Sequence, residues 1–409
     1  MDYSKKNDTV LTIDVLYMLN IIESNGHRAL IVGGAVRNFL MGIEVTDIDI
    51  ATTALPTNII SIFEGIGISV IPVGIEHGTV IVLYKGKPYE ITTLREDVKT
   101  FGRHAEVSFT QSFQIDSNRR DFTMNAIYMD KTGSLFDYHG GISDIHERKV
   151  VFIGDPTQRI HEDYLRIFRY FRFVAYYGGF KINDEYITII YSLKENIAKL
   201  SLERILSELL KILQLENGYK IISHMKPILD VIFHLQHNSL EICEKIGVGI
   251  ESMSPVERFC MMIKFSHIRY KEMVRKLNFP RNIKRLLILE CEDLESNQYY
   301  IENVKICLKN IRKDFRGYYI KYLLVKMYIL KIIAKSQIKA FQKELENFCN
   351  SEYVDFMLKA SDLEEFHLAP HQLGEVMKST KKIWEKSSNI SHARCLEYAH
   401  ERIVQLLAE

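Results

Sequence analysis

Two glycines near the N-terminus have a setting suited to binding phosphate. Gly33 and Gly34 follow the apolar run Leu30–Val32, and Arg37 stands three residues further on. Paired glycines after a strand let backbone amides approach a phosphate closely, and the N-terminus of a following helix adds a favourable dipole. Arg37 could then contact a triphosphate. A glycine pair taken alone is more often a plain turn.

A pair of aspartates, Asp47 and Asp49, follows this segment. Their alternation with isoleucines predicts a strand in which both carboxylates project from one face. Such a pair can share two divalent cations ~3.5–4 Å apart, which activate an attacking hydroxyl and stabilise a leaving pyrophosphate. Glu90, in the strand candidate Tyr89–Thr92, could complete this metal site. The alternative for Glu90 is a charge that protects a sheet edge.

The segment Arg119–Asn125 places two arginines beside an acid and an amide at helical spacing. Arg120 could meet a phosphate. Asp121 and Asn125 are four residues apart, so they could share a helix face and contact a ribose. The alternative is a helix start with an internal salt bridge.

The segment Glu162–Arg172 is the most informative one. Arg166, Arg169 and Arg172 recur every three residues, Asp163 extends that row, and apolar side chains lie between them. Asp163 and Arg166 together present a carboxylate acceptor and a guanidinium donor. That pair can match the edge of a base without a nucleic-acid template. The alternative is an amphipathic helix with solvated arginines.

The elements that would position these residues change in character after Asp155. Before it, apolar runs alternate with helical segments, and a turn at 86–88 separates two strand candidates, Thr79–Tyr84 and Tyr89–Thr92. We therefore expect a small mixed sheet with helices packed on one side. Beyond it, glycine is scarce, and segments such as 200–215 and 318–341 carry helical periodicity. The fold class is thus an α+β palm followed by an all-α part.

Composition limits the remaining possibilities. The chain has 409 residues, 47% of them hydrophobic, so two to four domains or subdomains are expected. Its formal net charge is +1, so an RNA partner would require basic residues gathered on one face. None of the six cysteines forms a CxxC pair, which argues against a zinc site or disulfide framework and favours a reduced compartment. The sequence contains no run of eighteen apolar residues, so it predicts no membrane span.

In order and spacing, four segments resemble the class II CCA-adding tRNA nucleotidyltransferases of the poly(A) polymerase and tRNA nucleotidyltransferase family. They are Gly33–Arg37, Asp47–Asp49, Arg119–Asn125 and Glu162–Arg172. The likeness runs from about Ile31 to Phe173. It implies a nucleotidyltransferase head over residues 1–155 and neck helices with a nucleotide-selecting motif over 156–220. A helical body over 221–350 and a helical tRNA-binding tail over 351–409 would follow.

The resemblance implies transfer of CMP and AMP from CTP and ATP to the 3′ end of tRNA, with Mg²⁺ and release of pyrophosphate. Asp47 and Asp49 would hold the metal, and Glu90 would join them as a catalytic residue. The nucleotide-binding residues would be Gly33, Gly34, Arg37, Arg120, Asp121, Asn125, Asp163, Arg166, Arg169 and Arg172.

Further segments also match the family. Residues 95–104 resemble its flexible loop, needed for the final A, and 137–140 resemble a hinge-like motif. The family usually has Asp where this chain has Asn38, and Asn can still brace the helix there. The resemblance implies a cytoplasmic or organelle-matrix enzyme with no stable protein partner and no membrane attachment.

Three alternatives remain open at this point. A bacterial-type poly(A) polymerase shares the same head. A partial enzyme would add only CC or only A. A protein of a different class would have kept the fold and bound RNA without catalysis.

Overall fold

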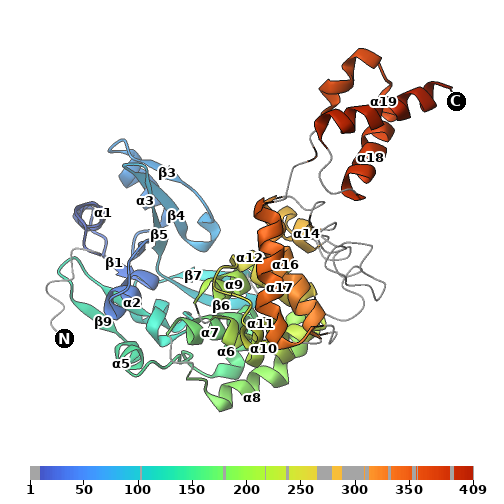
Figure 1. Cartoon of the computed structure of the whole chain (residues 1–409). Coiled ribbons are helices and arrows are strands. Elements are labelled where there is room, and N and C mark those ends of the chain that lie inside the picture. The colour runs from blue at the N-terminus through green and yellow to red at the C-terminus, as the bar shows by residue number, and fades with distance from the viewer. Residues whose placement is uncertain are drawn as a thin grey trace. The chain divides into compact units, whose positions relative to one another are not determined.

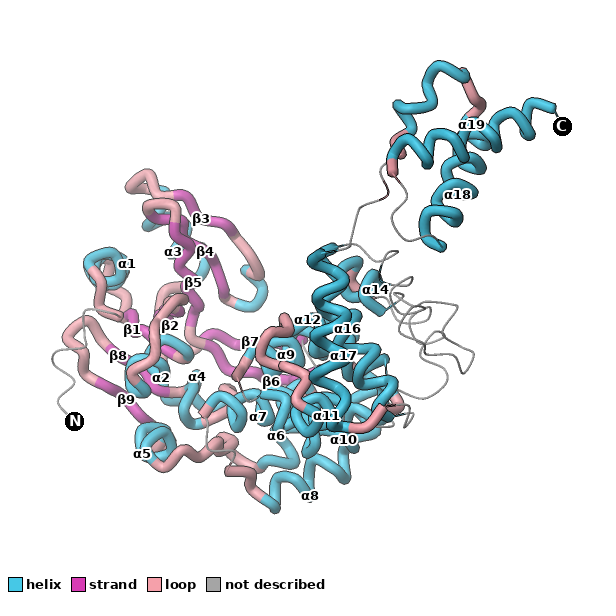
Figure 2. Tube along the Cα trace, in the orientation of Figure 1, coloured by secondary structure: helices cyan, strands magenta, loops and turns pink. Residues whose placement is uncertain are grey.

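In the computed structural model of this chain, a mixed sheet with surrounding helices is followed by helices alone (Figure 1). The structure describes residues 10–101, 104–177, 181–216, 218–235, 239–264, 279–287, 308, 313–329, 333–351, 356, 358–386 and 391–408. The chain divides into two compact units, Met1–Ile232 and Phe233–Glu409. Figure 2 shows that the described strands all belong to the first unit.

The main sheet has seven strands in the order β3-β4-β5-β2-β1-β8-β9. Their bounds are β1 Ala29–Val32, β2 Asp49–Thr52, β3 Ser69–Ile71, β4 Thr79–Tyr84, β5 Lys87–Thr93, β8 Ile127–Met129 and β9 Leu135–Asp137. All neighbours pair antiparallel except β2 and β5, which are parallel. The expected small mixed sheet is confirmed. A separate two-stranded sheet contains β6 Arg95–Phe101 and β7 His104–Phe109.

Local turn chemistry explains the β4–β5 hairpin. Lys85 and Gly86 separate the two strands, and both have positive φ, at 50° and 75°. A two-residue turn of this conformation matches the twist of antiparallel strands. The turn that we predicted at 86–88 therefore exists, shifted by one residue. Alternate residues of β5, namely Tyr89, Ile91 and Thr93, are buried, as expected for strand periodicity.

Helices α1, α2 and α3 of the first unit contact the seven-stranded sheet, and most of its other helices follow the last strand in the chain. The helices of this unit are α1 Ile13–Ser24, α2 Gly34–Met41, α3 Pro56–Glu64, η2 Ile75–His77, α4 Phe113–Asn118, η3 Thr123–Asn125, α5 Gly141–His146, α6 Pro156–Glu162, α7 Leu165–Tyr176, α8 Asp184–Leu193, η4 Lys194–Lys199, α9 Leu202–Gln214 and α10 Gly218–Phe233. Helix α9 lies within the predicted helical segment 200–215 and packs against α7.

All the named elements of the second unit are helices. Its helices are α11 Ser239–Ile246, α12 Pro255–Lys264, α14 Arg281–Leu287, α16 Lys313–Ile329, α17 Lys335–Ser351, η6 Ala360–Phe366, α18 Pro370–Lys386 and α19 His392–Ala408. The predicted segment 318–341 is divided between α16 and α17. At the C-terminal end, Trp384 and Ile403 join a separate apolar cluster formed by η6, α18 and α19. None of the helices described is long and apolar enough to cross a membrane.

Gly141 allows α5 to pack directly on the backbone of η3. A Cβ at residue 141 would lie 2.6 Å from the carbonyl carbon of Thr123. We therefore expect Gly141→Ala to lower stability by roughly 1–3 kcal/mol, because backbone cannot yield as a flexible side chain can. Thermal melts would measure the loss, with Gly317→Ala as control, because a Cβ at Gly317 would meet no atom within 4 Å. Equal melting temperatures for wild type and Gly141→Ala would contradict this expectation.

Candidate active site

Gly33 forms the turn between β1 and α2 at the centre of the candidate site. Its φ is 73°, a conformation that favours glycine, and α2 begins after it without a side-chain cap. A Cβ at this position would lie 3.6 Å from Arg120 Nη1 and 3.7 Å from Asp49 Oδ2. The backbone at Gly33 is therefore close to both a cation and a candidate metal ligand.

Asp49 and Glu90 lie side by side on neighbouring strands. Asp49 is the first residue of β2 and pairs in parallel register with Glu90 of β5. Because β5 lies between β2 and β4, the alternative of an edge-strand glutamate is wrong. Asp47 differs from expectation, since β2 begins at Asp49 and Asp47 lies exposed in the preceding loop. A shared strand face therefore does not align the two aspartates.

The charges of these acids act on one another. Burial raises the pKa of Asp49 above its ordinary value; Arg120 opposes this rise, and the carboxylate of Asp47 adds to it. Desolvation of the Glu90 carboxylate, followed by the charge of Asp49, raises the pKa of Glu90 in the same way. Asp49 thus carries a negative charge that the surrounding protein does not fully compensate.

This donor set fits a divalent cation that is only partly held by protein. Within the described ranges, no cluster of three or more His, Cys, Asp or Glu side chains has the spacing of metal ligands. Mg²⁺, however, commonly takes only one or two protein carboxylates and completes its shell with water and substrate phosphates. Asp49, next to the turn at Gly33, and Asp47, whose charge acts on Asp49, have the chemistry of such a pair of carboxylates.

In the metal-free protein, we expect Asp49→Asn to raise the melting temperature at neutral pH. The raised folded-state pKa means that the folded protein holds this proton more tightly than the unfolded chain does. The resulting cost is absent below the unfolded pKa, grows as pH rises through the folded pKa, and is fully present at neutral pH. Asparagine removes it. Melts between about pH 4 and about pH 8 without divalent cations test this, and a variant that melts below wild type at neutral pH contradicts it.

A chain of hydrogen bonds connects α2 to α7. Arg37 Nη1 donates to Asn125 Oδ1 at 2.6 Å, and Asn125 Nδ2 donates to Asp121 Oδ1 at 3.0 Å. Arg169 Nε then donates to Asp121 Oδ2 at 2.6 Å. Burial alone would raise the pKa of Asp121, but Arg169 and the hydrogen bonds lower it to about 2. The carboxylate of Asp121 is therefore ionised and engaged by protein groups.

One local expectation in this region is wrong, and another agrees with the structure. The predicted helix over Arg119–Asn125 is wrong, because α4 ends at Asn118 and the short helix η3 begins at Thr123. Asp121 and Asn125 are nevertheless in direct contact through the hydrogen bond at 3.0 Å. Asn38 braces α2 as expected, since its Oδ1 accepts from Arg37 Nη2 at 2.8 Å and its Nδ2 donates to the carbonyl of Glu44.

Asp163 does not extend the arginine row of α7. It is in extended conformation between α6 and α7, and its Oδ1 accepts the N–H of Leu165 at 3.1 Å. Its Oδ2 accepts from Arg204 Nη2 at 2.7 Å. Arg166 donates to Glu162 Oε2 at 2.5 Å, so Asp163 and Arg166 are each bound to other partners. The predicted continuous helical stripe is broken at Asp163.

The remaining arginines of α7 are ion-paired instead of freely solvated. Arg172 Nε lies 2.6 Å from Glu208 Oε2 on α9, and Arg172 also stacks over the ring of Phe173 at 4.2 Å. Arg169 Nη2 lies 2.5 Å from Asp121 Oδ2. Helix α7 is amphipathic, as this alternative held, but its arginines are ion-paired, so the solvated arginines of that alternative are wrong.

Sequence reasoning did not identify the partners of these residues. Arg204 and Glu208 are on α9, where no motif marks them, although their helical spacing places both on one face. Arg159 Nη2 donates to the carbonyls of Arg119 and Arg120, both at 2.6 Å, and thereby holds α6 against the preceding segment. The only signal in the sequence was the charged residue Glu208 at a position between the apolar residues Leu206 and Leu209.

Two further predicted segments have defined structure. Residues Arg95–Phe101 and His104–Phe109 are paired strands instead of a loop; residues 102–103 lie outside the described residues. In the hinge-like segment, the Asp137 carboxylate accepts the N–H groups of His139, Gly141 and Ile142 at 2.9–3.2 Å. This carboxylate thereby fixes the turn from β9 into α5.

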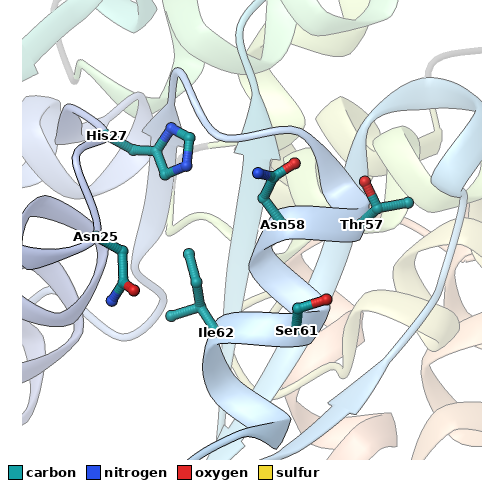
Figure 3. A pocket seen from close by; sticks show the side chains of 6 residues that line it. All are labelled: Asn25, His27, Thr57, Asn58, Ser61 and Ile62. Atoms are coloured by element: carbon teal, nitrogen blue, oxygen red, sulfur yellow. The ribbon is translucent and has the colours of Figure 1, made fainter.

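An open pocket of about 290 Å³ lies elsewhere in the first unit (Figure 3). Its lining residues are Asn25, His27, Thr57, Asn58, Ser61 and Ile62. The pocket is near the residues that precede β1, whereas Gly33 follows the last residue of β1. It presents no carboxylate, lysine or arginine, so it lacks the charges that a metal–triphosphate site requires.

The glycine turn, the acids on the mixed sheet and the ordered arginines together form the candidate site of the first unit. The model of the poly A polymerase head domain matches residues 29–151, and the model of the probable RNA and SrmB-binding site of polymerase A matches 179–227. The chain belongs to the CCA tRNA nucleotidyltransferase family, as its similarity to curated proteins shows.

Three relatives illustrate this similarity. The human mitochondrial CCA tRNA nucleotidyltransferase 1 is 40% identical over 261 residues, 62% of this chain and 59% of that protein. The mouse protein of the same name is 35% identical over 315 residues, 75% of this chain and 70% of that protein. A CCA-adding enzyme of Anoxybacillus flavithermus is 32% identical over 296 residues, covering 72% and 69%. The match thus spans less than two thirds of the human relative.

Solved structures show the same fold at low identity. The CCA-adding enzyme of Bacillus stearothermophilus in complex with CTP aligns with TM-score 0.66 and 24% identity, covering 97% of this chain and 99% of that one. The CCA-adding enzyme of Thermotoga maritima complexed with tRNA aligns with TM-score 0.66 and 17% identity, covering 99% of each chain. The expected α+β head followed by an all-helical part is therefore confirmed.

Proposed function

We propose that this chain transfers CMP and AMP from CTP and ATP to the 3′ end of tRNA, selecting each nucleotide without a nucleic-acid template. The observation that carries the proposal is the approach of Asp49 and Arg120 to the turn at Gly33, with Glu90 paired to Asp49 on the neighbouring strand. An acid pair beside an open, cation-flanked backbone turn suits a metal-bound triphosphate. Solved relatives that bind CTP or tRNA support the choice of substrates.

Asp47 and Asp49 would hold Mg²⁺, with Glu90 beside them. When bound there, Mg²⁺ would supply Lewis acidity that activates the attacking 3′-hydroxyl and stabilises the leaving pyrophosphate. Arg120, with its guanidinium next to Gly33, would bind the triphosphate. The network from Arg37 to Arg169 would hold α2 and α7 at a fixed spacing around the nucleotide.

Asp163 and Arg166 would contact the base edge, and Arg172 would shape the pocket floor. Arg204 and Glu162 hold these two side chains in this structure, and a further lone pair of the Asp163 carboxylate would accept from the base. The head 1–155, neck 156–220, body 221–350 and tail 351–409 are the proposed division of labour. We place the enzyme in the cytoplasm or in an organelle matrix; the human relative is named as mitochondrial.

The decisive experiment is incorporation of labelled CTP and ATP, with and without Mg²⁺, into tRNA lacking its 3′ CCA and into tRNA ending in CC. We expect two C additions followed by one A, all dependent on the metal. Long A tracts without C would indicate a poly(A) polymerase. C addition alone or A addition alone would indicate a partial enzyme, and tRNA binding without incorporation would indicate the non-catalytic alternative.

We expect tRNA affinity to weaken by roughly tenfold or more between about 50 and about 200 mM salt, despite the net charge of +1. Exposed lysines such as Lys378 and Lys382 on α18 would displace counterions from phosphates. Replacing either lysine with Gln should reduce the slope of log affinity against log salt by about one. Binding titrations at several salt concentrations test this, and a flat salt response would contradict it.

A further inference from the structure

A buried carboxylate that is not among the predicted site residues binds Arg119 and Arg120. Asp116 on α4 is 1% exposed. Its Oδ1 accepts from Arg119 Nε at 2.9 Å and from the N–H of Arg95 at 3.2 Å. Its Oδ2 accepts from Tyr128 Oη at 2.8 Å and from Arg120 Nη2 at 3.1 Å. A single acid therefore receives hydrogen bonds from four residues.

Two of the three guanidinium nitrogens of Arg120 are occupied in this arrangement. Nε donates to Asp116 Oδ2 and Tyr128 Oη, both at 3.2 Å, and Nη2 donates to Asp116. The Cζ atom of the Arg120 guanidinium also lies over the Tyr128 ring, 5.4 Å from the ring centroid. Nη1 has no hydrogen-bond partner among the described residues, and it is the atom closest to a Cβ placed on Gly33.

We propose that Asp116 is a positioning residue that fixes Arg120 so that Nη1 faces the triphosphate of the incoming nucleotide beside Asp49. The inference rests on the proposed function and extends it, because Asp116 does not itself reach the nucleotide. Tyr128 supports the same guanidinium, because its hydroxyl accepts from Arg120 Nε and donates to Asp116 Oδ2.

The geometry favours positioning over simple charge neutralisation. A long arginine side chain loses conformational freedom whenever it binds a phosphate, and prior fixation removes that cost from nucleotide binding. If Asp116 only neutralised the charge of Arg120, Nη1 would not need to stay without a partner on the side of Asp49. Burial alone would raise the pKa of Asp116, but Arg120 and Arg119 lower it to about 2, so the clamp stays ionised at working pH.

Steady-state kinetics with a double-mutant cycle test the inference. Asp116→Asn keeps the side-chain shape and removes the charge, so we expect KM for both CTP and ATP to rise about tenfold. In an Arg120→Ala background, the same substitution should change KM by less than about twofold, because the side chain that it positions is gone. Tyr128→Phe, which keeps the ring, should show the same coupling with a smaller effect.

Arg119→Gln is the matched control, because it removes the other arginine bound to the same carboxylate. It should lower the melting temperature about as much as Asp116→Asn does while leaving nucleotide KM within about twofold of wild type. This comparison separates a structural loss from a loss of positioning. Should Asp116→Asn fail to fold, the cycle between Tyr128→Phe and Arg120→Ala decides the question alone.

Two results would overturn the inference. One is an equal rise in KM on adding Asp116→Asn to wild type and to Arg120→Ala. The other is a fall in melting temperature with an unchanged KM. Failure of the wild-type protein to incorporate either nucleotide would instead refute the proposed function, so the two failures are distinguishable.

Discussion

Substituting Asp49 with alanine is expected to slow CMP and AMP transfer by about 10³-fold or more. The carboxylate is at the start of β2, beside Glu90 and next to the turn at Gly33. If Asp49 holds a metal, its loss removes several kcal/mol of transition-state stabilisation, and each ~1.4 kcal/mol is a factor of ten in rate. Asp47→Ala should have a comparable effect. Single-turnover incorporation of labelled CTP at saturating Mg²⁺ measures both.

Binding of tRNA should be nearly unchanged in these variants, because affinity for RNA comes mainly from basic residues elsewhere. Asp14→Ala is a suitable control, since Asp14 lies in the same unit and forms only a surface ion pair with Lys85 at 2.7 Å. Its rate should match wild type. Activity within about tenfold of wild type for Asp49→Ala would refute the metal assignment.

Features that depend on neighbouring residues could be read from the sequence. The turn at Gly33 requires only an apolar run followed by residues tolerant of positive φ. The hairpin at Lys85 and Gly86 requires only a short turn between two alternating segments. In both cases the local preference and the final fold agree.

Features that depend on distant pairing could not be read in this way. Glu90 joins Asp49 only because β5 pairs in parallel with β2, a register that two separate strand patterns do not specify. The break at Asp163 arises because its carboxylate accepts from Leu165 and from Arg204, 41 residues further on. Helical spacing alone predicted an uninterrupted stripe, and tertiary contacts overrode it.

The same limitation concealed Asp116. The side chain is on a six-residue helix, and Arg119 and Arg120, three and four residues further on, would equally suit an ordinary surface ion pair, so nothing in the sequence indicated that Asp116 is buried. Only the fold shows that it is buried beneath Arg120 and Tyr128. The residues predicted to contact the nucleotide therefore appeared in sequence motifs, whereas the residues that hold them did not.

The arrangement at Asp163 leads to the second large expected effect, a change in which nucleotide is selected. Cytosine offers an amino donor beside the N3 acceptor, and adenine offers an amino donor beside N1. Asp163 can accept from either amino group, and Arg166 can donate to either ring nitrogen. Uracil and guanine place a carbonyl at the amino position, so the carboxylate would face an oxygen with no proton between them. Leaving such a group unpaired costs ~1–3 kcal/mol, or roughly tenfold or more in discrimination.

Asp163→Ala should therefore lower the use of CTP and ATP and narrow the gap to UTP and GTP, while Arg166→Ala should reduce CTP and ATP use more than tRNA binding. Because Arg204 holds the Asp163 carboxylate in this structure, the carboxylate is already oriented before a base arrives. Asp184→Ala, an exposed acid at the start of α8, is the control and should keep wild-type selectivity. The measurement is kcat/KM for all four nucleotides on tRNA lacking CCA and on tRNA ending in CC. Wild-type rates and wild-type selectivity in Asp163→Ala would mean that this carboxylate braces α7 and α9 through Arg204 and does not read the base.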